Sequence, residues 1–118
     1  MKYNSVEAFV PSGKDFQKSK ELFTELGFSV VRESNDYISF ANNDLRFILQ
    51  RYDDKDFAEN FMMRVTVDDL DEFWKEISAQ GLPEQFGVSL KEPTNFPWGR
   101  EVNLIDLAGV CWHFTESD

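Results

Sequence analysis

The chain has 118 residues, 42% of them hydrophobic, and its 22 Asp and Glu against 12 Lys and Arg give a formal net charge of −10. This length and apolar content allow one sizeable hydrophobic core. Nucleic acid is excluded as an expected partner, because phosphate binding needs Lys and Arg. No apolar run approaches membrane-spanning length and no export signal is recognised at the N-terminus, so we expect a cytoplasmic protein with no membrane partner.

The first half of the chain predicts one strand, one helix and a three-stranded meander. A short strand is expected at residues 5–10, and Asp15 is the expected N-cap of a helix that ends at Gly27. Three alternating or apolar runs follow, with turns that contain Asn and Asp between them. These runs are residues 28–31, 37–40 and 45–50.

The second half of the chain repeats this order. A strand is expected at residues 61–67, and Asp69 caps a second helix, which Gly81 and Pro83 end. Asp69 follows Asp15 by 54 positions, and each of the two caps precedes its glycine by 12 positions. Cap, helix and stop therefore recur as an internal repeat.

The end of the chain predicts a β-hairpin. A poorly defined strand at residues 86–90 leads into an expected loop at residues 91–97. Trp98 then lies in a turn between a proline and a glycine. Residues 101–105 and 110–114 alternate polar with apolar side chains, and an Ala-Gly turn joins them.

Together these elements predict an α+β fold of two tandem β-α-β-β-β modules. Module one is residues 1–51 and module two is residues 61–118, joined by an acidic and polar linker at residues 52–60. Each module has one helix, which needs an apolar sheet face to cover. We therefore expect each module to be one sheet with a single helix packed on it.

Strand alternation separates the side chains of these strands into two faces. The apolar face of each strand is expected to meet a helix. The opposite faces carry a mixed polar set, which is Arg46, Ile48, Gln50, Met62, Arg64, Thr66, Cys111 and His113. Such a set suits the lining of a ligand cavity, although a solvated sheet face has a similar composition.

The C-terminal stretch reads Pro-Trp-Gly-Arg-Glu and then Asp-Leu-Ala-Gly-Val-Cys-Trp-His-Phe. It closely resembles the C-terminal hairpin of the bleomycin-resistance proteins, a branch of the vicinal-oxygen-chelate superfamily that includes glyoxalase I and the extradiol dioxygenases. The matching residues are Pro97, Trp98, Gly99, Arg100, Glu101, Asp106, Ala108, Gly109, Cys111, His113 and Phe114. The resemblance is weaker but collinear over the rest of the chain.

This resemblance implies curved, mixed sheets that form cups, and a homodimer in which two chains share the cups by exchanging elements. In the resistance proteins, aromatic side chains of both subunits sandwich the flat rings of the drug. Tyr37 and Trp98 match such positions, but Arg64 stands where an aromatic is expected, and it repels a cationic ligand unless an acid pairs with it. The expected ligand-binding residues are Tyr37, Ile48, Gln50, Met62, Arg64, Trp98, Cys111 and His113.

Enzymes of the superfamily hold a divalent metal with His and Glu side chains. The matching positions here are Glu7 or Ala8, Gln50, Met62 and His113. His113 is an ordinary metal ligand, and Glu7 is a second only if a one-residue insertion shifts the alignment. The resistance proteins have His at the position of His113 and ligate no metal, so we expect no metal and no cofactor.

Three functions follow from these observations. The first is non-catalytic binding and sequestration of a bleomycin-type antibiotic or a related planar or cationic compound, which confers antibiotic resistance. The second is a metal-dependent lyase, isomerase or dioxygenase with an atypical metal site, and the third is a protein-interaction module. The lone Cys111 is interpreted as a small buried thiol, and Arg100 and Glu101 are expected to be structural.

Overall fold

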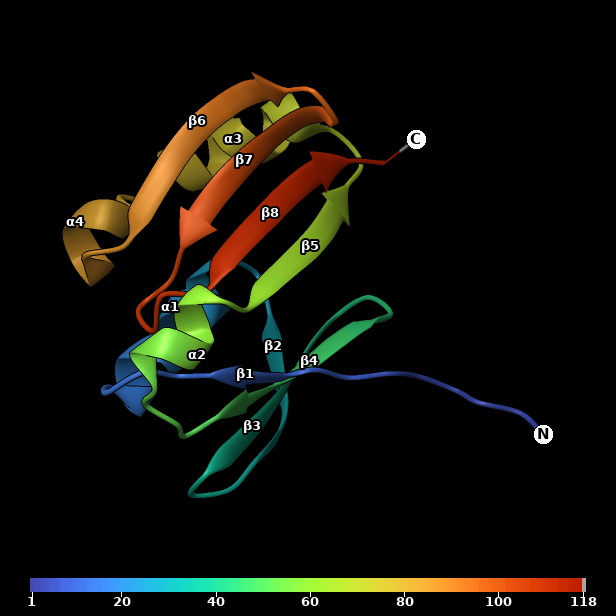
Figure 1. Ribbon diagram of the computed structural model, residues 1–118, viewed down its shortest axis with the longest axis vertical. Helices are drawn as coiled ribbons and strands as arrows, with labels where there is room; N and C mark the ends of the chain where they lie inside the picture. Colours follow the sequence, from blue (N-terminus) through green and yellow to red (C-terminus); the bar gives the residue numbers. More distant parts are fainter. Residues whose placement is uncertain (118) are drawn as a thin grey trace.

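The computed structural model describes residues 1–117, in which two four-stranded sheets have helices packed against them (Figure 1). The strands of the first sheet are β1 (Phe9–Pro11), β2 (Ser29–Glu33), β3 (Tyr37–Asn42) and β4 (Leu45–Gln50). Their order is β1-β4-β3-β2, with β1 parallel to β4 and the other pairs antiparallel. Helix α1 (Phe16–Glu25) connects β1 to β2.

The second sheet repeats this topology. Its strands are β5 (Met62–Val67), β6 (Ser89–Phe96), β7 (Gly99–Ile105) and β8 (Cys111–Glu116). Their order is β5-β8-β7-β6, and again the first strand is parallel to the last while the other pairs are antiparallel. Helix α3 (Leu70–Ser78) packs against this sheet (Figure 1). The predicted α+β class with two β-α-β-β-β modules is confirmed.

The two predicted helix caps form as the sequence indicates. The Asp15 carboxylate accepts a hydrogen bond from the backbone N–H of Lys18 at 3.0 Å, and the Asp69 carboxylate accepts one from Glu72 at 3.1 Å. Each bond satisfies a donor that the first turn of a helix otherwise leaves unpaired. The two caps therefore begin equivalent helices in the two halves of the chain.

The two sheets share one hydrophobic core around Trp112. Its ring centroid lies 5.2 Å from those of both Phe23 on α1 and Phe47 on β4, although Trp112 belongs to β8. The ring of Phe23 also lies 5.1 Å from that of Phe47. Since the apolar faces of both sheets meet in this core, the mixed polar faces point away from it.

A buried carboxylate, Asp106, organises the turn between β7 and β8. One oxygen accepts the backbone N–H groups of Ala108, Gly109 and Val110 at 3.0–3.1 Å, and the other accepts the indole N–H of Trp112 at 2.9 Å. Burial raises the pKa of Asp106, and these hydrogen bonds partly offset that effect. Asp106 thus fixes both the turn and the central tryptophan of the core.

Gly13 of the first module lies against this same turn. A Cβ atom at Gly13 would lie 3.0 Å from the Cα of Ala108, and the φ angle of Gly13 is +78°. A side chain at this position would meet both a steric contact and a backbone conformation that L-residues disfavour. Glycine therefore lets the two modules approach closely here.

The first strand begins and ends later than predicted. The expected strand at residues 5–10 is wrong in extent, because β1 is Phe9–Pro11. Pro11 was expected to break the strand, but β1 is an edge strand, where a residue without an N–H group removes no ladder bond. Residues 1–6 are exposed and extend away from the rest of the molecule (Figure 1), whereas the Ala8 carbonyl accepts the Ile48 N–H at 2.9 Å.

The loop predicted at residues 91–97 is wrong, because most of this segment belongs to strand β6. The strand expected at residues 86–90 also starts too early, because β6 begins at Ser89. Proline is disfavoured in a central strand, and this segment contains Pro93. In the structure, β6 is an edge strand, and its register shifts between Lys91 and Thr94, on either side of Pro93. Such a bulge accommodates proline without the loss of a ladder hydrogen bond.

Two short helices were not predicted. The expected linker at residues 52–60 contains α2 (Lys55–Glu59), which Asp54 caps. The second long helix ends at Ser78, and Pro83 does not end it but lies in the first turn of α4 (Leu82–Phe86). Within residues 1–117, no helix combines the length and apolarity needed to cross a membrane.

We predict that Asp106→Ala lowers the free energy of unfolding by about 2–4 kcal/mol, because four donors lose their acceptor and the Trp112 indole N–H is left buried. Urea denaturation followed by Trp fluorescence measures this change. The control is Asp53→Ala, which removes an exposed acid without hydrogen bonds in the described residues. A loss below about 0.5 kcal/mol for Asp106→Ala, equal to that of the control, would show that the turn does not depend on this carboxylate.

Candidate functional site

Strand register brings four of the predicted site residues together on the second sheet. Met62 pairs with Cys111, and Arg64 pairs with His113, across the parallel β5–β8 ladder. Paired residues point to the same face of a sheet, so all four lie opposite the face that buries Trp112. Met62 and Arg64 are exposed, whereas Cys111 and His113 are half-buried. These side chains form one continuous surface.

A buried carboxylate, Glu101, lies on this same face and was not predicted as a site residue. It is 3% exposed. Its Oε1 atom lies 2.6 Å from Nδ1 of His113 and accepts from Nδ2 of Asn103 at 3.2 Å. Its Oε2 atom accepts from Nε1 of Trp98, also at 3.2 Å. We call these four residues the Glu101 network.

The Glu101 network stabilises the ionised carboxylate. Burial raises the pKa of Glu101, but hydrogen bonds from His113, Asn103 and Trp98 outweigh burial, and the pKa lies below its ordinary value of 4.5. Because an ionised carboxylate only accepts, Nδ1 of His113 carries the shared hydrogen. The other ring nitrogen, Nε2, is buried and has no hydrogen-bond partner within residues 1–117.

Trp98 presents a flat aromatic surface at the edge of this face. It lies in the two-residue turn between β6 and β7 and is 70% exposed. Its ring stacks on that of Phe96, with 4.9 Å between centroids and 7° between planes. Its indole N–H is held by Glu101. Since both the plane and the N–H are fixed, the ring is already ordered for stacking.

Trp98 and Arg64 line a common cavity of about 500 Å³, a volume suited to a small molecule. The cavity lies where the ends of β5 and β8 meet the β6–β7 turn and the start of α3. The other residues of its wall are Leu70, Gly99, Arg100, Thr115 and Glu116.

Most charged groups of this cavity already have partners. Arg100 forms an ion pair with Asp71 on α3, which agrees with the structural role expected for it, and Glu116 accepts the first backbone N–H of α3 at 2.9 Å. In contrast, Arg64 is exposed and forms no ion pair within the described residues. The hydroxyl of Thr115 is buried and also lacks a partner there. A ligand in this cavity would find the Arg64 guanidinium available.

The remaining predicted site residues lie on the first sheet. Tyr37 pairs with Gln50, and Ile48 pairs with both Ser39 and Phe9. The rings of Phe9 and Tyr37 meet edge to face with 6.0 Å between centroids, and they are 52% and 44% exposed. The first mixed face therefore has an exposed aromatic pair of its own.

Within one chain, the structure does not bring these two groups together. Tyr37, Ile48 and Gln50 are on the first sheet, whereas Trp98 borders the second. Both mixed faces point away from the core around Trp112. A site that contains both Tyr37 and Trp98 would need a face from each of two chains.

The thiol of Cys111 is poorly suited to nucleophilic chemistry. Burial raises its pKa, and the negative charges of Glu101 and Asp106 raise it further. The reactive form of cysteine is the thiolate, which these surroundings disfavour. Cys111 is half-buried, so it packs on the mixed face and does not lie in the core.

The positions that match the metal ligands of the superfamily do not fit a metal ion here. Gln50 is on β4, Met62 on β5 and His113 on β8, and Glu7 precedes β1. No group of three or more His, Cys, Asp or Glu side chains in residues 1–117 is arranged to hold a metal. An amide and a thioether are weak ligands for the divalent metals of such sites.

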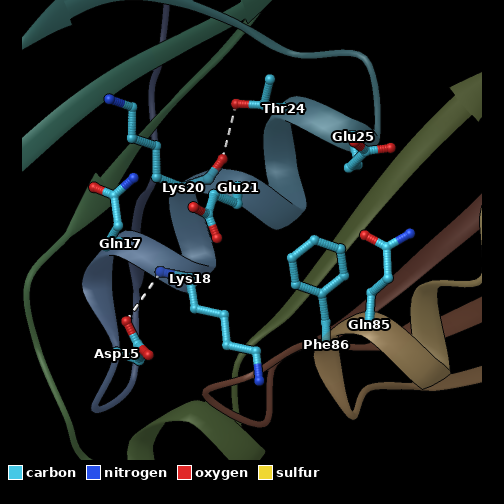
Figure 2. Close-up of a pocket in the computed structure, with 9 residues that line it drawn as sticks. All are labelled: Asp15, Gln17, Lys18, Lys20, Glu21, Thr24, Glu25, Gln85 and Phe86. Atoms are coloured by element: carbon cyan, nitrogen blue, oxygen red, sulfur yellow. Dashed lines mark hydrogen bonds between the residues drawn. The ribbon is translucent and has the colours of Figure 1, made fainter.

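Another cavity, of about 570 Å³, lies between α1 and α4 and contains none of the predicted site residues (Figure 2). Its α1 wall consists of long polar side chains, and Phe86 of α4 lies opposite them. Asp15 caps α1, and Lys20 pairs with Glu33 at 2.9 Å. Because capping and surface ion pairing explain these polar groups, we do not place the functional site here.

The residues that sequence reasoning missed are Phe9, Glu101, Asn103 and Thr115. Alternation was a usable signal for the two on β7, because Glu101 and Asn103 alternate with the buried Val102 and Leu104. Glu101 was left out because it and Arg100 were expected to form a structural charged pair that fixes the loop or bridges to another chain. The structure shows instead that Arg100 and Glu101 point to opposite sides of β7. Arg100 pairs with Asp71, and Glu101 pairs with His113.

Residues 6–114 match the model of the Glyoxalase/Bleomycin resistance protein/Dioxygenase superfamily. The chain belongs to this superfamily. The name of the superfamily covers both drug-resistance proteins and enzymes. No protein of curated function matches the sequence.

Solved structures of antibiotic-binding and antibiotic-resistance proteins have the same fold at low sequence identity. A bleomycin-binding protein of Streptomyces verticillus, complexed with copper(II)-bleomycin, is 21% identical with a TM-score of 0.80, over 100% of this chain and 99% of that one. The bleomycin resistance determinant of transposon Tn5 is 21% identical with a TM-score of 0.81, over 98% and 99%. The fosfomycin resistance protein FosX of Listeria monocytogenes, with Mn(II) and sulfate, is 15% identical with a TM-score of 0.74, over 100% and 93%.

We predict that Glu101→Gln lowers the free energy of unfolding at pH 7 by about 1–3 kcal/mol, because an amide replaces a charged acceptor of three hydrogen bonds. The folded-state pKa of Glu101 lies below 4.5, so the ionised carboxylate stabilises the fold above pH 4.5. This contribution is lost as the pH falls through the folded-state pKa. The difference between variant and wild type should therefore narrow below pH 4.5.

Urea denaturation at a series of pH values from 7 to 3.5 measures this difference. Glu21→Gln, which changes an exposed acid on α1, is the matched control and should show little effect at any pH. A difference between Glu101→Gln and wild type that stays constant over the whole series would contradict the role of the charge.

Proposed function

We propose that this protein binds and sequesters a planar small molecule without transforming it. The proposed ligand is a bleomycin-type antibiotic or a related compound. The observation that carries the proposal is the ordered Trp98 ring beside a cavity of small-molecule size. The fold shared with bleomycin-binding proteins supports it. The Glu101 network supports it too, because the buried Glu101 carboxylate holds the indole N–H of Trp98 in place.

We also propose that the working form is a homodimer. Each mixed face exposes large apolar side chains, among them Tyr37 and Met62, and exposed apolar patches mark interaction surfaces. The extended segment at residues 1–6 carries the exposed Tyr3 and Val6, and it is suited to exchange with a second chain. A dimer with exchanged elements would place the first face of one chain opposite the second face of its partner and so unite Tyr37 with Trp98. We expect it to work in the cytoplasm.

Two measurements test this proposal. Light scattering at micromolar concentration should give the mass of two chains, and titration with bleomycin should quench Trp fluorescence. The Trp98→Ala variant should remain dimeric and lose at least half of this quenching, while Trp74→Phe, a conservative change on α3, should retain it. A monomeric mass would contradict the shared site, and a dimer that shows no quenching would remove bleomycin as the ligand.

The alternative function is a metal-dependent enzyme, since the superfamily contains enzymes and FosX shares the fold. It would require an atypical metal site, because Gln50 and Met62 supply neither a carboxylate nor an imidazole. An interaction module without a small-molecule ligand is the third candidate. It would be favoured by failure to bind any compound in a broad thermal-shift panel.

We predict that the protein, incubated with Mn, Ni, Zn or Fe salts and then desalted, retains less than one metal ion per chain and shows no glyoxalase activity. The reason is the weak ligand set at the four matching positions. Metal analysis by mass spectrometry measures retention. One metal per chain, lost in His113→Ala but kept in Met62→Leu, would favour the enzyme and contradict simple sequestration.

A further inference from the structure

The central row of the second mixed face is basic and polar from one edge of the sheet to the other. Register pairs Lys91 with Asn103, Asn103 with His113, and His113 with Arg64. These four side chains therefore lie side by side across β6, β7, β8 and β5. With about 4.8 Å between neighbouring strands, the row spans about 14 Å. Lys91 and Arg64 are exposed at its two ends.

The first mixed face has basic side chains as well. Arg46 is on the same face of β4 as Ile48, and Arg32 pairs with Ser39, which itself pairs with Ile48. Both arginines are exposed, and within residues 1–117 neither forms an ion pair or a side-chain hydrogen bond. Register places them on the same face as the aromatic pair of Phe9 and Tyr37.

Acidic side chains are nearly absent from these faces. Among positions that strand register places on the two mixed faces in residues 1–117, the acidic residue is Glu101, which is buried and accepts three hydrogen bonds. Glu7 precedes β1 and Glu92 lies in the bulge of β6, so both are outside the ladders. This contrasts with the chain as a whole, in which acids outnumber Lys and Arg by 22 to 12.

We propose that the site prefers a planar aromatic ligand that carries a negative charge, and that Arg64 is a residue that sets this preference. The inference rests on the proposed binding function and names its ligand class. The ring would stack on Trp98, and the acidic group would contact the Arg64 guanidinium in the same cavity.

The net charge of −10 does not oppose this preference strongly. At an ionic strength of 0.1 M the Debye length is about 10 Å, so acids on the far surface of the molecule are screened from a ligand in the site. The groups that decide are those within a few ångströms of the ligand. In this cavity, Arg100 and Glu116 are engaged with α3, and Arg64 remains the available charge.

Three probes of the same ring system separate ring stacking from charge. Anthracene-9-carboxylate is an anion at pH 7, 9-anthracenemethanol is neutral, and 9-(aminomethyl)anthracene is a cation. Calorimetric titration of the full chain at 50 mM NaCl should show the carboxylate bound at least about tenfold more tightly than the amine. Raising NaCl to 300 mM should weaken binding of the carboxylate, because salt screens its contact with Arg64.

Two variants locate the effect. Arg64→Gln should weaken carboxylate binding at least about fivefold, as expected for the loss of a charge-assisted contact. It should change binding of the alcohol by less than about twofold. Lys75→Gln, which removes one exposed positive charge from α3, is the matched control and should leave all three affinities within about twofold. Circular dichroism verifies that both variants are folded.

The outcomes separate this inference from the function on which it rests. If the alcohol and the amine bind but the carboxylate does not, or if the amine binds as tightly as the carboxylate, the anionic preference is wrong and sequestration stands. If Arg64→Gln leaves carboxylate binding unchanged, Arg64 does not set the preference. If none of the three probes binds at millimolar concentration, the inferred ligand class is wrong, and the bleomycin titration decides the binding function separately.

Discussion

The shared core around Trp112 is the constraint on which the rest of the structure depends. Both sheets bury their apolar faces in it, and Trp112 from the second module packs directly against Phe23 and Phe47 of the first. A strand has two faces, so the faces left over must point outward. The mixed polar surfaces are therefore a consequence of how the core is built. Whatever they bind is bound away from the centre of the chain.

Two buried carboxylates connect this core to the outward faces. Asp106 holds the indole of Trp112 and the turn beside it, and Glu101 holds Trp98 and His113 on the opposite face. Both acids belong to the motif that carries the family resemblance, and both have a structural explanation in this chain. The motif thus accounts for the scaffold and for the ordered Trp98 ring, while the choice of ligand depends on residues outside it, such as Arg64.

The surface of this protein has acidic regions and basic regions. The helices and loops carry most of the acids, whereas the mixed faces carry Arg32, Arg46, Arg64 and Lys91. Total charge therefore describes the environment of the whole molecule and not that of the site. A ligand within a few ångströms of Arg64 responds to its neighbours, because salt screens the more distant acids.

The sequence by itself determined the local elements and the sides of the strands. The caps at Asp15 and Asp69 and the alternating sides of β4, β5 and β8 depend on residues close together in the chain, which a sequence displays directly. Strand β6 was expected to end at residue 90 but continues to Phe96, because an edge strand tolerates Pro93 and position in a sheet is a tertiary property. Only the tertiary structure decided that Glu101 pairs with His113 and not with Arg100, since that pairing depends on the register between β7 and β8. The sequence also shows that an arginine, Arg64, lies on the mixed face of its strand. Whether an acid pairs with Arg64 depends on which side chains the fold brings near it.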